Sequence, residues 1–596
     1  MTPVVFEDCF GWLHPAAGRR GVVLCAPYGN EALTTHRAWR AFAERLAEAG
    51  LPTLRFDYPG TGDSVGDEED PDRLRAWIDG IHVAVRFLRA NTGVEEVALV
   101  GLRLGALLAT VAAQEARGVN ALVLLAPCLS GRSFVQELRA MSLLSAPPEG
   151  APPAVTEEGI DNGGFRLTAE TMSALQRLDL LALTEPPAPR VLLFDRPDAR
   201  GAGRLRDHIR KLGVDLREEP FPDFAQLMSN VQRATGPCET LERATAWLKE
   251  GAPAGNVPQA PGPGASLALP GAMEHPVRFG PTEELFGVLC EPADPADRRD
   301  RPAVLLLNSG ATCHVGSGRM SVRLARRLAA RGYASLRIDL AGLGDSGSRT
   351  GRADNLIYCQ EAVSDVRAAL DWLEARGYRR CVVVGLCAGA ATALHGALAD
   401  ARIVGQALIN PGRYVLGDGV TSEAVTGTAI KPMAAYLPRL ADRATWRAIL
   451  RKDRKAARVA HGLTKRIVQR VRIKAGRVRA WMTGRGYATD DVAHWFHRLS
   501  ERGVHTLLVH GADDVTLGEF ETHFGRDGGP LRGIRNLRME RIAGADHSLT
   551  IGPARDRFAS LLDEHLEAID AATAQTMARN GATMIPKRAF ASGTEG

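Results

Sequence analysis

Short apolar runs alternate with amphipathic segments along most of the chain, and this alternation predicts strands and helices in turn. The apolar run at 21–27 is followed by apolar residues at helical spacing over 41–49, and a glycine ends the pattern. The same order recurs with an apolar run at 303–310 and a helical pattern over 322–330. Strands that alternate with helices in this way predict mostly parallel sheets covered by helices on both faces.

The two halves of the chain repeat each other, most clearly at one strand and the turn after it. LRFDYPGTGDS in the first copy matches LRIDLAGLGDS in the second. Another helix and another apolar strand follow in both copies. The spacing agrees, because Asp57 to Arg103 spans 46 positions and Asp339 to Cys387 spans 48. Agreement in order, motif and spacing predicts a tandem duplication.

The pattern divides the chain into two α/β domains. We expect a first domain over 1–250, a linker rich in Pro, Gly and Ala over 251–273, a second domain over 274–575 and a flexible tail over 576–596. A long insertion in the second domain, at about 413–503, is expected to form a helical cap.

Each copy places a Gly-x-X-x-Gly turn directly after its later apolar strand. VVVGLCAGA has Cys387 at the centre of the turn, and ALVGLRLGA has Arg103 there. The two glycines permit a sharp strand-to-helix turn that lifts the central side chain above the sheet, which is the nucleophile elbow of α/β-hydrolases. A thiol at that position can attack a carbonyl carbon, whereas a guanidinium cannot.

The second copy also holds an acid and a histidine in the chain order that α/β-hydrolases use. Asp514 follows a late strand and is the favoured acid, with Asp513 as the alternative. His547 lies on a loop near the end of the domain. A thiol at a helix N-terminus beside a histidine should ionise near neutral pH, so Cys387 is the expected nucleophile. The alternative to these catalytic roles is that Cys387 is a buried structural cysteine and His547 an ordinary histidine of a surface loop.

Donors for a developing oxyanion are expected beside the elbow. The backbone N–H of Ala388 opens the helix after the turn, and that of Gly310 or Ala311 follows the first strand of the domain. His314 lies in the same loop, where it is either a substrate contact or an ordinary polar loop residue.

The first copy lacks a base, because Ala225 falls where the second copy has its histidine. We therefore expect the first domain to be unable to perform covalent catalysis. Its Arg103 either binds a carboxylate or phosphate group or pairs internally with Asp57, Asp195 or Asp198.

Composition excludes several classes of protein. The 596 residues are 45% hydrophobic and 24% charged, and the net charge of +5 is small for this length, so nucleic acid is not an expected partner. The nine cysteines show no metal-ligand spacing, which favours a reducing compartment and predicts neither a metal site nor another cofactor. The start has no pattern of a secretion signal, and no apolar run is long enough to span a membrane, so we expect a cytoplasmic protein.

One tract of the predicted cap is strongly basic. Residues 447–479 interleave Arg and Lys with aliphatic side chains. Such a helix could lie on an anionic membrane surface or hold an anionic substrate, or it could be a solvated helix face. The first alternative would place the protein at the inner face of the membrane.

In these motifs the chain resembles the α/β-hydrolases of bacterial exosortase and exopolysaccharide gene clusters. The second domain carries the resemblance in LLNSG with the following HVG and Arg319, in LAGLGDS and in GLCAG. The first domain resembles a sister group through GNE with HR, FDYPGTGDS and GLRLGA. The resemblance implies that an elbow without serine, as at Arg103, also occurs in that sister group. A cysteine in place of the commoner serine favours thioesters, lactones or transfer to an alcohol.

The sequence therefore predicts a hydrolase or acyltransferase that acts on ester or thioester substrates, free or carrier-bound, through Cys387, His547 and Asp514. The first domain is expected to be non-catalytic. The alternative is a scaffold or binding protein with two degenerate hydrolase folds. The acyl group, the acceptor and the oligomeric state stay open.

Overall fold

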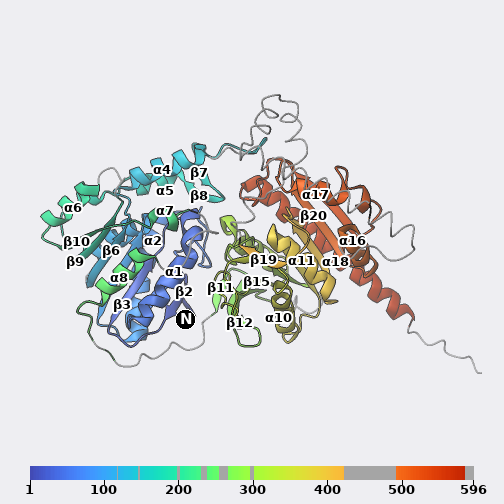
Figure 1. Cartoon of the computed structure of the whole chain (residues 1–596), viewed down its shortest axis with the longest axis horizontal. Helices are drawn as coiled ribbons and strands as arrows, with labels where there is room; N and C mark the ends of the chain where they lie inside the picture. Colours follow the sequence, from blue (N-terminus) through green and yellow to red (C-terminus); the bar gives the residue numbers. More distant parts are fainter. Residues whose placement is uncertain are drawn as a thin grey trace, which may run out of the picture.

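The computed structural model describes residues 1–116, 118–144, 148–196, 202–229, 238–253, 255, 266–294, 301–421, 475 and 491–583. Two units lie side by side along the long axis of the molecule (Figure 1). We call residues 1–253 the N-terminal half and residues 266–583 the C-terminal half. Each half is built on its own mixed, mostly parallel sheet with helices on both faces, which confirms the predicted fold class.

The sheet of the N-terminal half has the strand order β1-β2-β4-β3-β5-β6-β9-β10. The pairs β1–β2 and β2–β4 are antiparallel, and the remaining neighbours are parallel. The strands are Thr2–Phe6 (β1), Cys9–His14 (β2), Arg20–Cys25 (β3), Thr53–Phe56 (β4), Glu96–Leu102 (β5), Val119–Leu125 (β6), Arg190–Asp195 (β9) and Asp215–Pro220 (β10).

Helices cover both faces of this sheet, and an insertion lies above its C-terminal edge (Figure 1). The covering helices are Asn30–Glu48 (α1), Arg73–Thr92 (α2), Leu104–Glu115 (α3), Ala202–Lys211 (α6), Phe224–Leu227 (α7) and Glu239–Lys249 (α8). The insertion consists of Gly131–Leu144 (α4), the hairpin Gly159–Asn162 (β7) and Phe165–Thr168 (β8), and Ala169–Leu175 (α5).

The C-terminal half repeats this plan with the strand order β11-β12-β13-β15-β14-β17-β18-β20-β21. Its strands are Leu267–Leu269 (β11), Ala272–Phe279 (β12), Leu285–Pro292 (β13), Ala303–Leu306 (β14), Ser335–Asp339 (β15), Cys381–Leu386 (β17), Ile403–Ile409 (β18), His505–Gly511 (β20) and Leu537–Ile542 (β21). Its helices are Met320–Ala330 (α9), Ala362–Glu374 (α10), Ala388–Ala399 (α11), Val492–Glu501 (α16), Leu517–Phe524 (α17) and Gly552–Thr583 (α18). A separate pair joins Leu356–Cys359 (β16) to Asp418–Thr421 (β19).

Two predicted boundaries differ from the structure. The end of the expected linker, 251–273, already belongs to the second sheet, because β11 pairs with β12 there. Helix α18 runs to Thr583, so the tail expected from residue 576 begins inside a helix. The expected cap at 413–503, with its basic tract, lies mostly outside the described residues.

The two halves meet through equivalent residues of the repeat. The strand arginine of each half pairs with the turn aspartate of the other: Arg55 with Asp345, and Arg337 with Asp63 at 3.0 Å. All four side chains are buried, so loss of one partner would leave an unpaired charge out of water. The fully buried Arg319 adds hydrogen bonds to four backbone carbonyls of the opposite turn, at Gly60, Gly62, Ser64 and Gly66.

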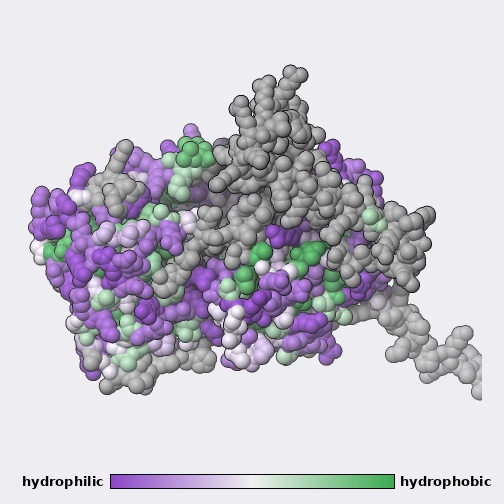
Figure 2. Space-filling view, in the orientation of Figure 1, coloured by the Kyte–Doolittle hydropathy of each residue, from purple (hydrophilic) through white to green (hydrophobic). Residues whose placement is uncertain are grey.

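Among the described residues, no helix combines the length and the apolar character that a membrane crossing requires. The face in Figure 2 is largely hydrophilic. A hydrophobic patch stands out at the top of the N-terminal half, over α4 (Figure 2). The exposed apolar side chains at the end of that helix are Met141, Leu143 and Leu144.

Candidate active site

Cys387 occupies a strained turn between β17 and α11. Its φ of 57° and ψ of −110° lie in a region that residues other than glycine rarely adopt. The two flanking glycines are required, since a Cβ on Gly385 would lie 2.1 Å from the carbonyl oxygen of Gly389. A Cβ on Gly389 would lie 2.4 Å from the carbonyl oxygen of Asn308. The turn therefore has the geometry expected of a nucleophile elbow.

His547 and Asp514 reach this turn from two other loops of the C-terminal half. The Nδ1 atom of His547 lies 2.9 Å from Oδ2 of Asp514, and the imidazole is near enough to the Cys387 thiol for each group to shift the pKa of the other. Oδ1 of Asp514 accepts a hydrogen bond from the backbone N–H of Thr516 at 2.8 Å. Asp513 is exposed, and Asp514 is the one of the two aspartates that contacts the histidine.

The thiol and the imidazole favour each other's charged forms. Burial would raise the pKa of Cys387, but the hydrogen bond and the charge of His547 lower it below its ordinary value of 9.0. Burial would lower the pKa of His547, yet hydrogen bonds to Asp514 and Cys387 raise it to about 10. The charged forms of the two groups therefore stabilise each other, and more of Cys387 is ionised at neutral pH than in an ordinary cysteine. The pKa of each of the other eight cysteines is raised, with burial as the main cause.

The loop that carries His547 is held by hydrogen bonds on both sides of the ring. Asp546 accepts the backbone N–H of Thr550 at 2.7 Å and its hydroxyl at 2.9 Å. Asn410 donates its side-chain N–H to the carbonyl oxygen of His547 at 2.8 Å. The same asparagine accepts the N–H of Gly511 and thereby ties this loop to the end of β20.

The expected oxyanion donors lie at the same edge of the sheet as Cys387. Ala388 opens α11, where the first backbone N–H groups of a helix have no partner within it. Gly310 follows β14, which is paired with β17, and the N–H of Leu307 donates to Val384 at 3.0 Å. Gly310 adopts a φ of 59°, which turns the chain sharply beside the elbow.

Tyr358, on β16, is a site residue that the sequence did not indicate. Its hydroxyl lies 3.5 Å from the sulfur of Cys387. Burial and the neighbouring thiolate raise the pKa of Tyr358 well above its ordinary value, so the phenol stays protonated and can donate to sulfur. A Cβ on Gly412 would lie 2.3 Å from this hydroxyl, which explains the glycine there. No sequence motif surrounds Tyr358, because the β16–β19 pair brings it to the elbow.

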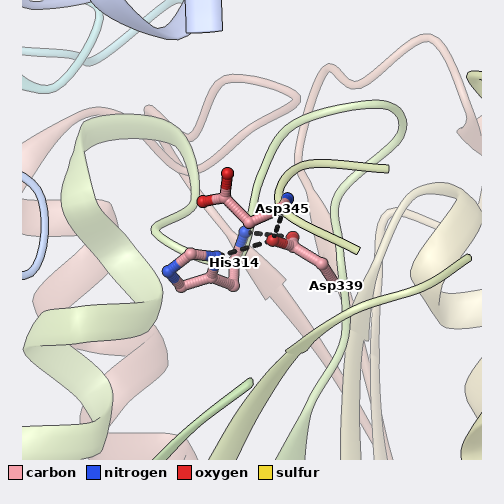
Figure 3. A group of neighbouring side chains, drawn as sticks. All are labelled: His314, Asp339 and Asp345. Carbon is pink, nitrogen blue, oxygen red and sulfur yellow. Dashed lines mark hydrogen bonds and ion pairs between the residues drawn. The ribbon is translucent and has the colours of Figure 1, made fainter. Parts of the chain in front are cut away.

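His314 does not lie where it could contact a substrate, which was one of its two expected roles. It is buried between the halves, with Nδ1 2.7 Å from Asp339 and Nε2 2.7 Å from Asp63 (Figure 3 draws the contact with Asp339). Burial opposes the charged form, but the two carboxylates raise the pKa of His314 well above its ordinary value. Both ring nitrogens are engaged, so neither is left for a substrate. His314, Asp339 and Asp345 have the residue types of a metal site. An imidazolium whose two N–H groups both donate to carboxylates has no free lone pair with which to bind a metal ion.

Arg103 sits at the elbow of the N-terminal half with a φ of 56° and a ψ of −117°, close to those of Cys387. Its guanidinium is buried and donates to Glu31 at 3.1 Å and to Glu137 at 2.6 Å. The internal pairing that was one alternative is therefore present, with these glutamates in place of the expected aspartates. Asp198 lies outside the described residues. Because carboxylates already occupy the guanidinium, binding of a further anion would require their displacement.

The insertion of the N-terminal half touches the loop of His547 at both of its flanks. A Cβ on Gly164, in the β7–β8 turn, would lie 3.0 Å from the carbonyl oxygen of Thr550. A Cβ on Gly544 would lie 3.0 Å from the carbonyl oxygen of Gly150. Arg555 adds a hydrogen bond to the carbonyl oxygen of Gly164 at 3.4 Å. The first half is therefore packed against the loop that carries the histidine of the second.

These sheets, elbows and loops define both halves as α/β-hydrolase domains. Residues 304–561 match the model of the alpha/beta hydrolase family, and residues 18–148 match the model described as serine aminopeptidase, S33. The chain is 30% identical over 182 residues to the polyketide transferase grgF of Penicillium sp. That match covers 28% of this chain and 61% of the fungal protein, so the chain spans less than two thirds of its length.

Solved structures of other proteins align with parts of this chain. Est1E from Butyrivibrio proteoclasticus, with bound ferulic acid, is 19% identical over 42% of this chain and 97% of its own, with a TM-score of 0.31. The crystal structure of GrgF from Penicillium sp. is 20% identical over 42% of this chain and 97% of its own, with a TM-score of 0.29. The esterase Pf2001 of Pyrococcus furiosus is 16% identical over 50% and 92%, with a TM-score of 0.31.

Proposed function

We propose that the C-terminal half is a cysteine-dependent acyl hydrolase or acyltransferase. The observation that carries the proposal is the grouping of Cys387, His547 and Asp514: the cysteine lies on a strained elbow, its pKa is lowered by His547, and His547 contacts Asp514. Of the nine cysteines, only Cys387 combines partial exposure with a lowered pKa. The similarity to a protein named a polyketide transferase supports acyl transfer as one form of the reaction.

The reaction would proceed in two displacements. The thiolate of Cys387 attacks the acyl carbonyl carbon, and the resulting oxyanion accepts hydrogen bonds from the N–H groups of Ala388 and Gly310. When the intermediate collapses, the bond to the leaving alkoxide or thiolate breaks, and that group takes a proton from His547. Water or an alcohol then gives a proton to His547 and attacks the acyl-cysteine. The second collapse releases an acid or an ester and restores the thiolate of Cys387.

Labelling with an activated acyl ester is the direct test. After brief treatment at pH 7 and digestion, mass spectrometry should find the acyl group on Cys387, and the His547→Ala variant should carry much less. Cys359 is a control within the same digest, because it is also partly exposed but burial raises its pKa. If Cys387 stays unmodified while Cys359 reacts, the enzyme proposal fails and the scaffold alternative gains support.

The N-terminal half would serve this site by positioning the loop of His547. Alanine at Gly164 should lower the acylation rate of Cys387 about tenfold, because its Cβ would press on Thr550, and small displacements of catalytic groups have large effects on rate. Gly150→Ala is a matched control: φ is +81° there and +89° at Gly164, but its Cβ meets nothing within 4 Å. Acylation rates and their pH profiles should separate the two variants. Equal rates would remove the positioning role and leave the reaction untouched.

The cellular setting is a further part of the proposal. The resemblance in the elbow and turn motifs supports a role beside exopolysaccharide synthesis, with a small or carrier-bound acyl substrate in the cytoplasm. Contact with an anionic membrane surface would fall to the basic tract at 447–479, which lies outside the described residues.

A further inference from the structure

The repeat places two equivalent aspartates in different surroundings. Asp339 accepts hydrogen bonds from the Asn308 side chain, from the N–H and ring of His314 and from the N–H of Asp345. Its counterpart Asp57 accepts one from the N–H of Asp63 at 2.9 Å, and the described part of the chain offers its carboxylate no ion-pair partner. Asp57 is only partly exposed, and a carboxylate largely removed from water normally has a partner of opposite charge.

Asp57 faces a cavity that the N-terminal half closes with aromatic rings. The cavity has a volume of about 80 Å³, whereas one water needs roughly 10–15 Å³ on the same scale. Its walls include the side chains of Tyr28, Phe56, Trp77 and Phe165, while Val315 of the C-terminal half closes one side. Tyr28 is only 8% exposed, and its hydroxyl is buried without a hydrogen-bond partner among the described residues.

The other charged groups at the cavity are already engaged. Glu68 is paired with Arg323 at 2.9 Å. Arg319 is bound to the four turn carbonyls described above. The His36 ring lies 3.4 Å from Asp345, whose main partner is Arg55. Within the described part of the chain, the carboxylate of Asp57 is thus the charge at this cavity with no partner at ion-pair distance.

We propose that this cavity binds a small organic cation, namely a primary ammonium group on a short apolar body. The ammonium would donate hydrogen bonds to Asp57, and the apolar body would contact the aromatic rings, which attract cations through their faces. None of Cys387, His547 and Asp514 lines this cavity, so the binding proposal can be tested independently of the acyl reaction. Since Val315 also lines the cavity, a bound amine would contact both halves.

Calorimetry with n-butylamine, n-butanol and butyrate at pH 7.5 tests the ammonium requirement. Butylamine should bind at least tenfold more tightly than butanol, and butyrate should not bind. In Asp57→Asn, whose amide oxygen can still accept the N–H of Asp63, the preference for the amine should vanish. Equal affinity for amine and alcohol in the wild type, or an unchanged preference in the variant, would overturn the proposal and leave a water-filled cavity.

A pH titration of the wild-type protein gives the same answer should the variant fail to fold. Burial and the negative charge of Asp63 raise the pKa of Asp57 to about 6. The hydrogen bond from the backbone N–H of Asp63 and the charges of His36 and Arg55 lower this pKa, but their effect is smaller. Butylamine stays protonated throughout this range. Its affinity should therefore fall up to tenfold per pH unit below pH 6, while that of butanol should not. An amine affinity that is flat from pH 7.5 to pH 5 would contradict the role of Asp57.

Discussion

Iodoacetamide should alkylate Cys387 about tenfold faster at pH 7 in the wild-type protein than in His547→Gln, and the rate should rise with pH over a lower range in the wild type. The thiolate is the reacting form, so the rate follows the fraction of Cys387 that is ionised. In the wild type the imidazolium of His547 lowers the pKa of Cys387 and so raises that fraction at a given pH. Glutamine carries no charge, and burial then raises the pKa of the thiol.

The sign of the effect follows from the two pKa shifts together. The pKa of His547 is raised to about 10, so the imidazolium persists at neutral pH. The wild-type to variant ratio should shrink as the pH rises into the range where the variant thiol ionises, although each thiolate of lower pKa is intrinsically a weaker nucleophile. Asp514→Asn should fall between the two, because His547 would lose only its orienting carboxylate. Superimposable pH profiles for the wild type and His547→Gln would show that no thiolate–imidazolium pair exists.

Parts of this site were predictable where a short sequence motif determines the backbone geometry. The Gly-x-X-x-Gly turn needs two glycines for close contacts at Gly385 and Gly389, and a buried apolar strand precedes it, so the elbow was recognisable. Asp514 and His547 followed from the order of strands, since parallel strands deliver their C-terminal loops to one edge of the sheet.

The partners of the buried polar residues were not predictable, because they come from segments far apart in the chain. His314 lies 251 positions from Asp63, and only the docking of the two halves joins them. Arg103 pairs with Glu137 of an insertion that carries no motif. Tyr358 reaches Cys387 through a two-stranded ribbon whose second strand follows β18. Local patterns specify turns and strands, whereas long-range charge pairing depends on the assembled fold.

The two copies of the repeat share motifs, but equivalent residues in them have different surroundings. LRFD and LRID look interchangeable, yet the loop before α9 in the second copy supplies His314 as a hydrogen-bond partner to Asp339, whereas no described side chain of the first copy hydrogen-bonds to the Asp57 carboxylate. The two aspartates, Asp57 and Asp339, should therefore respond in opposite ways to the same change.

Asp339→Asn should destabilise the protein by about 3–5 kcal/mol, because it breaks a buried ion pair and leaves the His314 imidazolium with one carboxylate. The new amide would also direct N–H groups at donors that now bind an oxygen. Asp57→Asn should instead stabilise the protein above pH 6, by about 1–3 kcal/mol. The pKa of Asp57 is raised from 3.8 to about 6, so the folded state holds its proton more tightly than the unfolded chain does.

The pH dependence of this gain follows from that direction. Below pH 3.8 Asp57 is protonated in both states and costs the fold no ionisation energy, and between pH 3.8 and pH 6 the cost appears as the unfolded chain loses its proton first. Urea unfolding of wild type and both variants at pH 4.5 and pH 7.5 measures the difference. Asp57→Asn should gain more stability over the wild type at pH 7.5 than at pH 4.5, while Asp339→Asn should lose it at both. If the two variants were destabilised alike, Asp57 would have a counterion after all, and the duplicated aspartates would be equivalent.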